Sequence, residues 1–565
     1  MYLPVTKAEA LKLGWNKLDV ILVTGDSYID SPFIGVAVIG KLLAARGYRV
    51  GIIAQPDVNS PDDIMRLGEP ELFWGVSGGS VDSMVANYTA SNKWRNQDDY
   101  TPGGVNDRRP DRAVIVYANL IRRFFKNTRP IVLGGIEASL RRVAHYDFWD
   151  NKIRRSILFD AKADYLLYGM AEKAVLELAE CLKTNRPVDS IRGLCTIAKE
   201  KPADYIELPS YSECVADKQA FISMFHQFYR NNDPLTAKGL CQLTGDRYLV
   251  QNPPQTHPTT AELDSYYELD YEREAHPAEL ARGKVRALDT IRFSITTHRG
   301  CYGECNFCAI AVHQGRTVTS RSKQSILNEA KNFTGDKNFK GVIADVGGPT
   351  ANMYGFECAK KLKSGECTDK RCIYPQTCIS LRPNHQPLTQ LLKELQRIEG
   401  VRKVFVASGL RYDLALDDRQ HGAEYLRQVV CHHTSGQMKI APEHTDDRVL
   451  ALMGKPGSAS LRKFKELFQK YTQEAGKEQY LTYYFIAAHP GCTDKEMAAL
   501  KEYASRQLAI APEQVQIFTP TPSTYSSLMY YTEQNPFTGE KLFVEKTLSG
   551  KERQKGIVVG KRGKI

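Results

Sequence analysis

The sequence lacks any long apolar run and any start typical of a secretory leader. No stretch of its 565 residues approaches the roughly 18 consecutive apolar residues that a membrane-spanning helix needs. Residues 1–7 show no basic start followed by an apolar core, which argues against a signal peptide. We therefore expect a cytoplasmic protein without membrane contact.

Strong charge of one sign is also missing. The net charge is +11 at pH 7, and six of these charges come from residues 541–565, where eight lysines and arginines stand against two glutamates. A basic, glycine-containing end of this kind can contact nucleic acid, but we expect a solvated, flexible terminus.

The first 195 residues alternate between compact apolar runs and helical patterns. The runs that predict buried strands cover residues 19–25, 48–54, 72–77, 130–135 and 163–169. Strand, helix and strand within about 35 residues form a βαβ unit, which requires a parallel sheet. We predict an α/β, Rossmann-like, doubly wound domain over residues 1–195.

The strand ends of this domain carry glycines but no dinucleotide-binding fingerprint. Ligands of doubly wound sheets bind at the carboxyl ends of the strands, where glycine lets the backbone approach closely. Gly25, Gly78–Gly79 and Gly134–Gly135 follow predicted strands, yet none belongs to a G-x-G-x-x-G pattern. We therefore predict no nicotinamide or flavin site.

Repeated βα units resume in the second half of the chain. The predicted strands cover residues 290–297, 341–346, 401–408, 437–441, 479–487 and 515–518. Polar residues follow each strand, as in a full or partial α/β barrel with its chemistry at the C-terminal face. We divide the chain into an N-terminal domain (1–195), a connecting segment (196–285), a barrel (286–525) and a basic tail (526–565).

Three of the thirteen cysteines lie directly after the first predicted barrel strand. Cys301, Cys305 and Cys308 have the spacing C-x3-C-x2-C, and in a reducing cytosol such groups indicate metal or redox sites. Three thiolates can hold one face of an iron–sulfur cluster and leave one iron of a cubane open. The alternatives are a zinc site, which usually has C-x2-C pairs, and three buried thiols. We predict a 4Fe–4S cluster.

This spacing, with Phe307 before the last cysteine, resembles the signature of radical S-adenosylmethionine (radical SAM) enzymes. Nearly the whole chain resembles the YgiQ family of these proteins. The resemblance implies a cobalamin-binding-like N-terminal domain followed by a radical SAM partial barrel. It also implies that an electron from a flavodoxin- or ferredoxin-like donor cleaves S-adenosylmethionine (AdoMet), giving methionine and a 5′-deoxyadenosyl radical that attacks a substrate.

The resemblance assigns AdoMet contacts to later strand ends of the barrel. Gly347–Gly348 stand at the family's Gly-Gly motif, with Pro349 where an acidic residue is common. Arg411 and Glu443 would contact the ribose or carboxylate of AdoMet, and Phe307 would pack near its adenine. Without the resemblance, the glycine pair has a simpler explanation, because glycines often end strands for reasons of backbone conformation. Arg411 and Glu443 can equally form salt bridges within the barrel.

Cobalamin is a cofactor that the resemblance leaves open. Domains that ligate cobalt through histidine use a D-x-H-x-x-G motif, and the nearest match is residues 30–35, with Pro32 at the histidine position. Proline cannot ligate cobalt, although some relatives bind cobalamin without that histidine. We favour a domain that recognises substrate or covers the barrel.

A second group of cysteines lies within 21 residues: Cys358, Cys367, Cys372 and Cys378. At 13 cysteines in 565 residues, such a window should hold about 0.5, so the group is an enrichment. Its intervals of eight, four and five residues match no tight zinc motif. An auxiliary iron–sulfur cluster, a zinc ion and free thiols remain as alternatives.

We predict a radical SAM enzyme that cleaves AdoMet, with no catalytic residue assigned and an unknown substrate. Residues 515–524 resemble the closing segment of radical SAM methylthiotransferases and related enzymes, many of which act on RNA or protein. The alternative is an iron–sulfur redox or nucleic-acid-binding protein without radical chemistry, which would account for the extra cysteines and the basic end.

Overall fold

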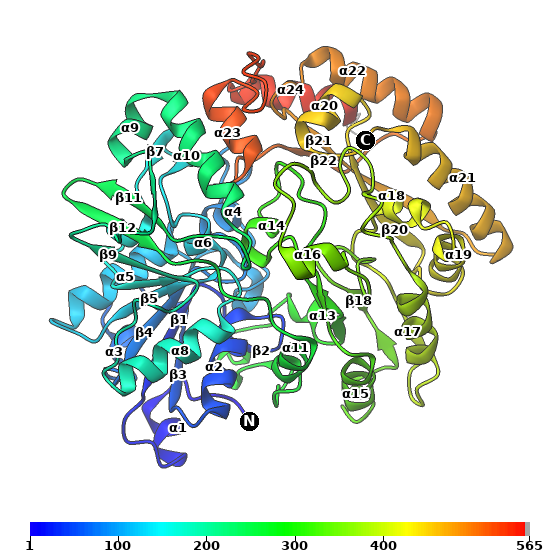
Figure 1. The fold of residues 1–565 in the computed structure, drawn as a ribbon. Helices are drawn as coiled ribbons and strands as arrows, with labels where there is room; N and C mark the ends of the chain where they lie inside the picture. Colours follow the sequence, from blue (N-terminus) through cyan, green and yellow to red (C-terminus); the bar gives the residue numbers. More distant parts are fainter. Residues whose placement is uncertain (560–565) are drawn as a thin grey trace. The chain divides into compact units, whose positions relative to one another are not determined.

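The computed structural model describes residues 1–559 and divides them into two compact units. The first unit comprises residues 1–257 and 265–292, and the second comprises residues 258–264 and the chain from residue 293 onward (Figure 1). Each unit has an apolar core of its own. Among residues 1–559, no helix combines the length and the apolar content needed to cross a bilayer.

The first unit is built on a nine-stranded sheet with a parallel half. The parallel strands lie in the order β3 (Val50–Ala54), β1 (Val20–Thr24), β4 (Phe73–Ser77), β5 (Ile131–Gly134) and β8 (Tyr165–Leu167). All five residues of β1 are buried, as expected for a central strand covered on both faces. The predicted doubly wound α/β fold is confirmed.

Residues 194–251 extend this sheet, where we predicted a connecting segment. The added strands are β9 (Leu194–Ala198), β10 (Ile206–Leu208), β11 (Leu240–Thr244) and β12 (Arg247–Gln251). β11 and β12 form a hairpin through the two residues Gly245-Asp246, with Gly245 at φ 66°. Gly-Asp between two apolar runs is a hairpin signal, and it distinguishes these residues from a connecting segment.

The second unit contains the barrel strands in chain order, all paired in parallel. β14 (Ser294–Thr296) pairs with β18 (Asp345–Gly347), and β17 (Val342–Ile343) pairs with β19 (Lys403–Val404). A parallel bridge from Leu410 to Ile440 leads to β20 (Gln437–Glu443), β21 (Tyr480–Ala487) and β22 (Val515–Ile517). The open run of strands confirms the predicted partial barrel.

Helices connect these strands, as a parallel sheet requires. They are α15 (Lys323–Thr334), α17 (Gln386–Gln396), α19 (Gly422–His432), α21 (Ala459–Glu474) and α22 (Asp494–Tyr503) (Figure 1). The connection from β18 to α17 is exceptional, because residues 348–385 contain only the short α16 (Ala359–Ser364).

The basic end is folded as far as residue 559, which corrects the expectation of a flexible tail. α23 (Tyr525–Thr532) and α24 (Leu548–Val559) belong to the second unit. The buried Lys551 donates to the Tyr530 hydroxyl at 2.9 Å. The side-chain amide of Gln554 donates to the Cys492 carbonyl at 3.1 Å. The remaining basic residues Lys561, Arg562 and Lys564 lie outside the described residues.

Candidate functional site

The three-cysteine loop is held at its base by a short antiparallel pair. β15 (His298–Arg299) pairs with β16 (Thr319–Ser320), and the Cys301 amide donates to the Gly315 carbonyl at 3.2 Å. Gly300 has φ 85°, and a Cβ there would lie 2.1 Å from the Thr317 carbonyl oxygen. Only glycine allows the chain to turn here and present the cysteines.

The cysteine side chains are half-buried, and each has a polar or charged neighbour. Cys301 Sγ lies 3.7 Å from Thr350 Oγ1 and accepts from the Gly303 amide at 3.3 Å. Burial raises the pKa of Cys301, and it raises the pKa of Cys308 to about 12. Both are therefore thiols near pH 7 until a bound metal removes the proton.

Two of the three sulfurs and the guanidinium of Arg411 lie close to Gly303. A Cβ at this position would lie 3.2 Å from Cys301 Sγ, 3.3 Å from Arg411 Nη1 and 3.6 Å from Cys305 Sγ. No three His, Cys, Asp or Glu side chains within residues 1–559 have the spacing that suits a single metal ion. Three thiols that do not converge on one point suit an iron–sulfur cluster better than a tetrahedral zinc ion, because each can bind a different iron.

Arg411 brings a positive charge to these thiols. It precedes α18 (Tyr412–Asp417), and its Nη1 lies 3.7 Å from Cys305 Sγ. Asp413 accepts from Nε at 2.8 Å and from Nη2 at 2.5 Å. Burial works against the charged guanidinium, but Asp413 and the nearby cysteines together raise the pKa of Arg411. Arg411 is thus a salt-bridge partner and also a neighbour of the cysteine loop.

The predicted Gly-Gly motif lies at the end of β18. The Gly347 carbonyl accepts from the Thr297 amide at 2.7 Å. A Cβ at Gly348 would lie 2.7 Å from both Cε1 and Nε2 of His298. His298 is fully buried, and burial lowers its pKa to about 3, so the imidazole is neutral near pH 7. The backbone at Gly348 can pass this ring only without a side chain.

Glu443 ends β20 in a strained backbone conformation. Its φ is 68°, which is uncommon for a residue other than glycine and is often found at functional sites. Burial raises the pKa of Glu443, and Lys455 Nζ lies 3.6 Å from its carboxylate. Glu443 also acts electrostatically on Cys308. Phe307 is half-buried and packs against the core of the second unit.

Several site residues were not identified from the sequence. They are His298, Thr350, Asn352 and Asp413. Asn352 accepts from the Arg411 amide at 2.9 Å and donates to the Arg411 carbonyl at 3.0 Å. The available signals were local: Thr350 follows the Gly-Gly motif closely, and Asp413 stands two residues after Arg411.

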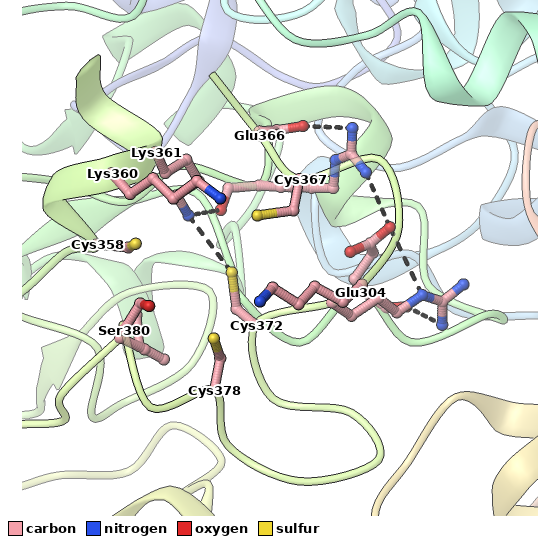
Figure 2. A pocket seen from close by; sticks show the side chains of 13 residues that line it. Glu304, Cys358, Lys360, Lys361, Glu366, Cys367, Cys372, Cys378 and Ser380 are labelled. Carbon is pink, nitrogen blue, oxygen red and sulfur yellow. Dashed lines mark hydrogen bonds and ion pairs between the residues drawn. The ribbon is translucent and has the colours of Figure 1, made fainter. Parts of the chain in front are cut away.

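The second group of cysteines also comes together in the second unit. Cys358, Cys367, Cys372 and Cys378 all line one pocket, shown in Figure 2. The four side chains come from the long connection between β18 and α17.

The strand ends of the first unit are filled by its own side chains. Arg109 pairs with Asp26 at 2.9 Å and with Asp98 at 3.0 Å. A Cβ at Gly25 would lie 2.2 Å from the Gly78 carbonyl oxygen, and one at Gly78 would lie 2.4 Å from Glu137 Oε2. These glycines therefore allow the protein's own groups to approach one another closely.

The D-x-H-x-x-G-like segment offers no histidine that could bind the cobalt of cobalamin. Asp30 is buried and pairs with Lys41 at 2.9 Å, and Pro32 offers no ligand to cobalt. A cobalamin held through a histidine of this segment is therefore excluded, whereas binding without such a ligand stays open.

Comparisons with known proteins match this architecture. The family model "Radical SAM N-terminal" matches residues 2–294, and "Radical SAM superfamily" matches residues 295–504. The UPF0313 protein FN0734 of Fusobacterium nucleatum is 59% identical over 562 residues, covering 99% of both chains. A UPF0313 protein of Thermotoga maritima is 48% identical over 565 residues, covering 100% of this chain and 99% of the relative.

Solved structures share the fold at low sequence identity. The radical S-adenosylmethionine methyltransferase TsrM of Kitasatospora setae, with cobalamin and a [4Fe–4S] cluster bound, is 15% identical at a TM-score of 0.50, covering 90% of this chain and 77% of that chain. The cobalamin-dependent S-adenosylmethionine radical enzyme OxsB is 13% identical at a TM-score of 0.50, and the match covers 93% of this chain and 57% of the OxsB chain. The chain belongs to the radical SAM superfamily, among the UPF0313 (YgiQ-family) proteins.

Proposed function

We propose that this radical SAM enzyme holds a 4Fe–4S cluster at Cys301, Cys305 and Cys308 and reductively cleaves AdoMet there. The observation that carries the proposal is the arrangement around Gly303, where a Cβ would lie within 3.6 Å of two of the three sulfurs and of Arg411. When bound, such a cluster supplies one electron to AdoMet, and the resulting 5′-deoxyadenosyl radical abstracts hydrogen from an unknown substrate.

Residues of this chain would hold the cluster, contact AdoMet and offset the negative charge of the thiolates. The three thiolates would occupy three irons and leave the fourth to AdoMet. Arg411 offsets negative charge at Cys305, from which it is 3.7 Å away. Gly347–Gly348 present backbone at the end of β18, and Glu443 offers a buried carboxylate at the end of β20 for the polar groups of AdoMet. Phe307 is our candidate for the adenine contact.

The cluster requires a reductant. Radical SAM enzymes typically take their electron from a partner, and we propose a flavodoxin- or ferredoxin-like donor in the reducing cytoplasm. All thirteen cysteines, which lie within the described residues, are unpaired thiols, as expected for that compartment. The substrate of the radical is unknown, and the similarity of the barrel's closing segment to methylthiotransferases, many of which act on RNA or protein, does not assign one.

The test is AdoMet cleavage by anaerobically purified protein. We expect dithionite and AdoMet to yield 5′-deoxyadenosine, measured by liquid chromatography with mass detection. The triple variant Cys301→Ala, Cys305→Ala, Cys308→Ala should yield none, whereas Cys431→Ala, at a half-buried cysteine elsewhere in the barrel, should retain the activity. Undiminished cleavage by the triple variant would refute the assignment.

The alternative without radical chemistry has less support from the described residues. Its main argument was the basic end, but Lys551 is buried against Tyr530 and Arg553 pairs with Asp494 at 2.7 Å. The same assay distinguishes the two functions, because a redox protein would be reduced by dithionite without forming 5′-deoxyadenosine. Salt-sensitive RNA binding would favour the nucleic-acid-binding alternative.

A further inference from the structure

We propose that Cys358, Cys367, Cys372 and Cys378 hold a second iron–sulfur cluster, separate from the one at Cys301, Cys305 and Cys308. All four side chains line a single pocket of the second unit. Figure 2 shows them gathered around one space together with the ammonium group of Lys361. Four cysteines can supply a complete ligand set, so this cluster would have no open iron.

The segment that carries these cysteines has little secondary structure to hold it. Residues 348–385 form the connection between β18 and α17, and α16 is the only helix or strand within it. A long connection without regular structure inside a compact domain is usually functional. A metal centre is one way in which a segment with a small core becomes rigid.

The apolar support of this segment is small and includes two of the cysteines. Cys358 is buried in a cluster with Tyr302, Met353, Ile373, Leu381 and other residues, and Cys372 packs against it. The Cys378 amide donates to the Cys372 carbonyl at 2.8 Å, which places these two residues at one turn. The backbone therefore brings the cysteines together without any disulfide among them.

The charge of the pocket suits an anionic cluster. Its lining includes the cations Arg316, Lys360, Lys361, Lys370 and Arg371 but only two carboxylates, Glu304 and Glu366. Arg316 is already paired with both glutamates. Lys361 Nζ lies 3.9 Å from Cys372 Sγ, close enough to interact with a thiolate. Hydrogen bonds to the sulfurs and nearby charges set the reduction potential of an iron–sulfur cluster.

Iron–sulfur chemistry accounts for the spacing better than zinc does. Structural zinc sites usually take two pairs of ligands, each with two to four residues between its cysteines. Of the three intervals here, only the four residues between Cys367 and Cys372 fall in that range, and the intervals of eight and five residues do not. In addition, no three metal-ligating side chains among the described residues converge at the distance that one ion requires. A cluster spreads its four thiolates over four irons and accepts this wider arrangement.

The pocket adjoins the loop of the first site. Glu304, between Cys301 and Cys305, belongs to its lining. Arg371 donates to the Glu304 carbonyl at 3.1 Å and to Asn306 Oδ1 at 2.8 Å. The Lys361 ammonium lies 4.9 Å from the ring centroid of Tyr302. A cluster held here would therefore fix one side of the three-cysteine loop.

The test counts metal in the anaerobic full-length protein. Iron, acid-labile sulfide and zinc are measured per chain, together with the Mössbauer spectrum. We expect about eight irons in the wild type and about four in the Cys301→Ala, Cys305→Ala, Cys308→Ala variant, because each cubane holds four. The variant Cys358→Ser, Cys367→Ser, Cys372→Ser, Cys378→Ser should also retain about four irons.

Two controls keep the result decisive. Cys431→Ser changes a half-buried cysteine of the same unit outside the pocket and should leave the iron content unchanged. The single variant Cys367→Ser replaces the quadruple variant if the latter does not fold, and it should lose part of the iron. The proposal would be overturned if the Cys301→Ala, Cys305→Ala, Cys308→Ala variant contained no iron. It would also be overturned if that variant contained zinc in place of iron. Neither result depends on AdoMet cleavage, so this proposal and the proposed function can fail separately.

Discussion

Arg411 Nη1 lies 3.7 Å from Cys305 Sγ, and Asp413 fixes the guanidinium in that position through two hydrogen bonds. A fixed positive charge beside a cluster ligand favours the reduced cluster, because reduction adds negative charge. We therefore expect Arg411→Gln to retain its iron but to shift the reduction potential by on the order of 100 mV to more negative values. The shift is measured by anaerobic potentiometric titration followed by electron paramagnetic resonance.

The matched control is Arg397→Gln, which removes an exposed arginine of the same unit. It should leave the potential unchanged, because charges in water are screened. An unchanged potential in Arg411→Gln would show that this arginine acts only as the partner of Asp413.

Gly303 is the position where an added methyl group tests the cluster site most directly. Gly303→Ala would place Cβ 3.2 Å from Cys301 Sγ and 3.3 Å from Arg411 Nη1. These contacts are tight, so the Cys301 side chain or the Arg411 guanidinium must give way, at a cost of about 1–3 kcal/mol. We expect lower iron content and slower formation of 5′-deoxyadenosine. Gly409→Ala, where a Cβ meets nothing within 4 Å, should match the wild type in both assays.

Gly348 offers a comparison between two adjacent glycines. A Cβ at Gly348 would lie 2.7 Å from the ring of the buried His298, whereas one at Gly347 would come no closer than 3.3 Å, to Ala351 Cα. Gly348→Ala must therefore shift either the His298 ring or the backbone that is proposed to contact AdoMet. We expect at least about tenfold weaker AdoMet binding, equivalent to 1.4 kcal/mol, by equilibrium dialysis. Gly347→Ala should cost less, and equal losses in both variants would contradict the argument.

Elements with a strong local pattern could be predicted from the sequence. The strands β1, β20 and β21 are continuous apolar runs or alternate clearly, so their existence and type follow from periodicity. Cys301, Cys305 and Cys308 could be recognised as cluster ligands because they lie within eight residues of the chain. The short strands β9 to β12 gave weaker patterns, and their sheet depends on pairing across residues 194–251.

The other residues of the site meet through tertiary contacts, which cannot be predicted from the spacing of residues along the sequence. Asn352 reaches Arg411 and also lies 3.0 Å from His385 Nε2, whose other ring nitrogen lies 2.9 Å from Asp418. These side chains come from three separate segments and meet only in the folded barrel. The enrichment of cysteines in residues 358–378 indicated a candidate metal site, but the pocket that they share could not be derived from the sequence, because only residues 359–364 of this segment form regular structure.

His433 provides a prediction on stability against pH. Its Nδ1 donates to the Val404 carbonyl at 2.8 Å, and Gln428 donates to its Nε2 at 3.1 Å. Both ring nitrogens are therefore hydrogen-bonded when the ring is neutral. Burial lowers the pKa of His433 to about 4, against about 6.5 for an unfolded histidine. Between these values the unfolded chain binds the additional proton.

Stability from this group is therefore complete above pH 6.5 and is lost as the pH falls toward 4, by about 1.4 kcal/mol per pH unit. We expect the urea midpoint of the anaerobic protein to fall between pH 7 and pH 5.5, and His433→Gln to reduce the slope of that fall while lowering the midpoint at pH 7. His432→Gln, at the exposed neighbouring histidine, should alter the slope far less. An identical slope in wild type and His433→Gln would mean that His433 titrates alike in the folded and unfolded chain.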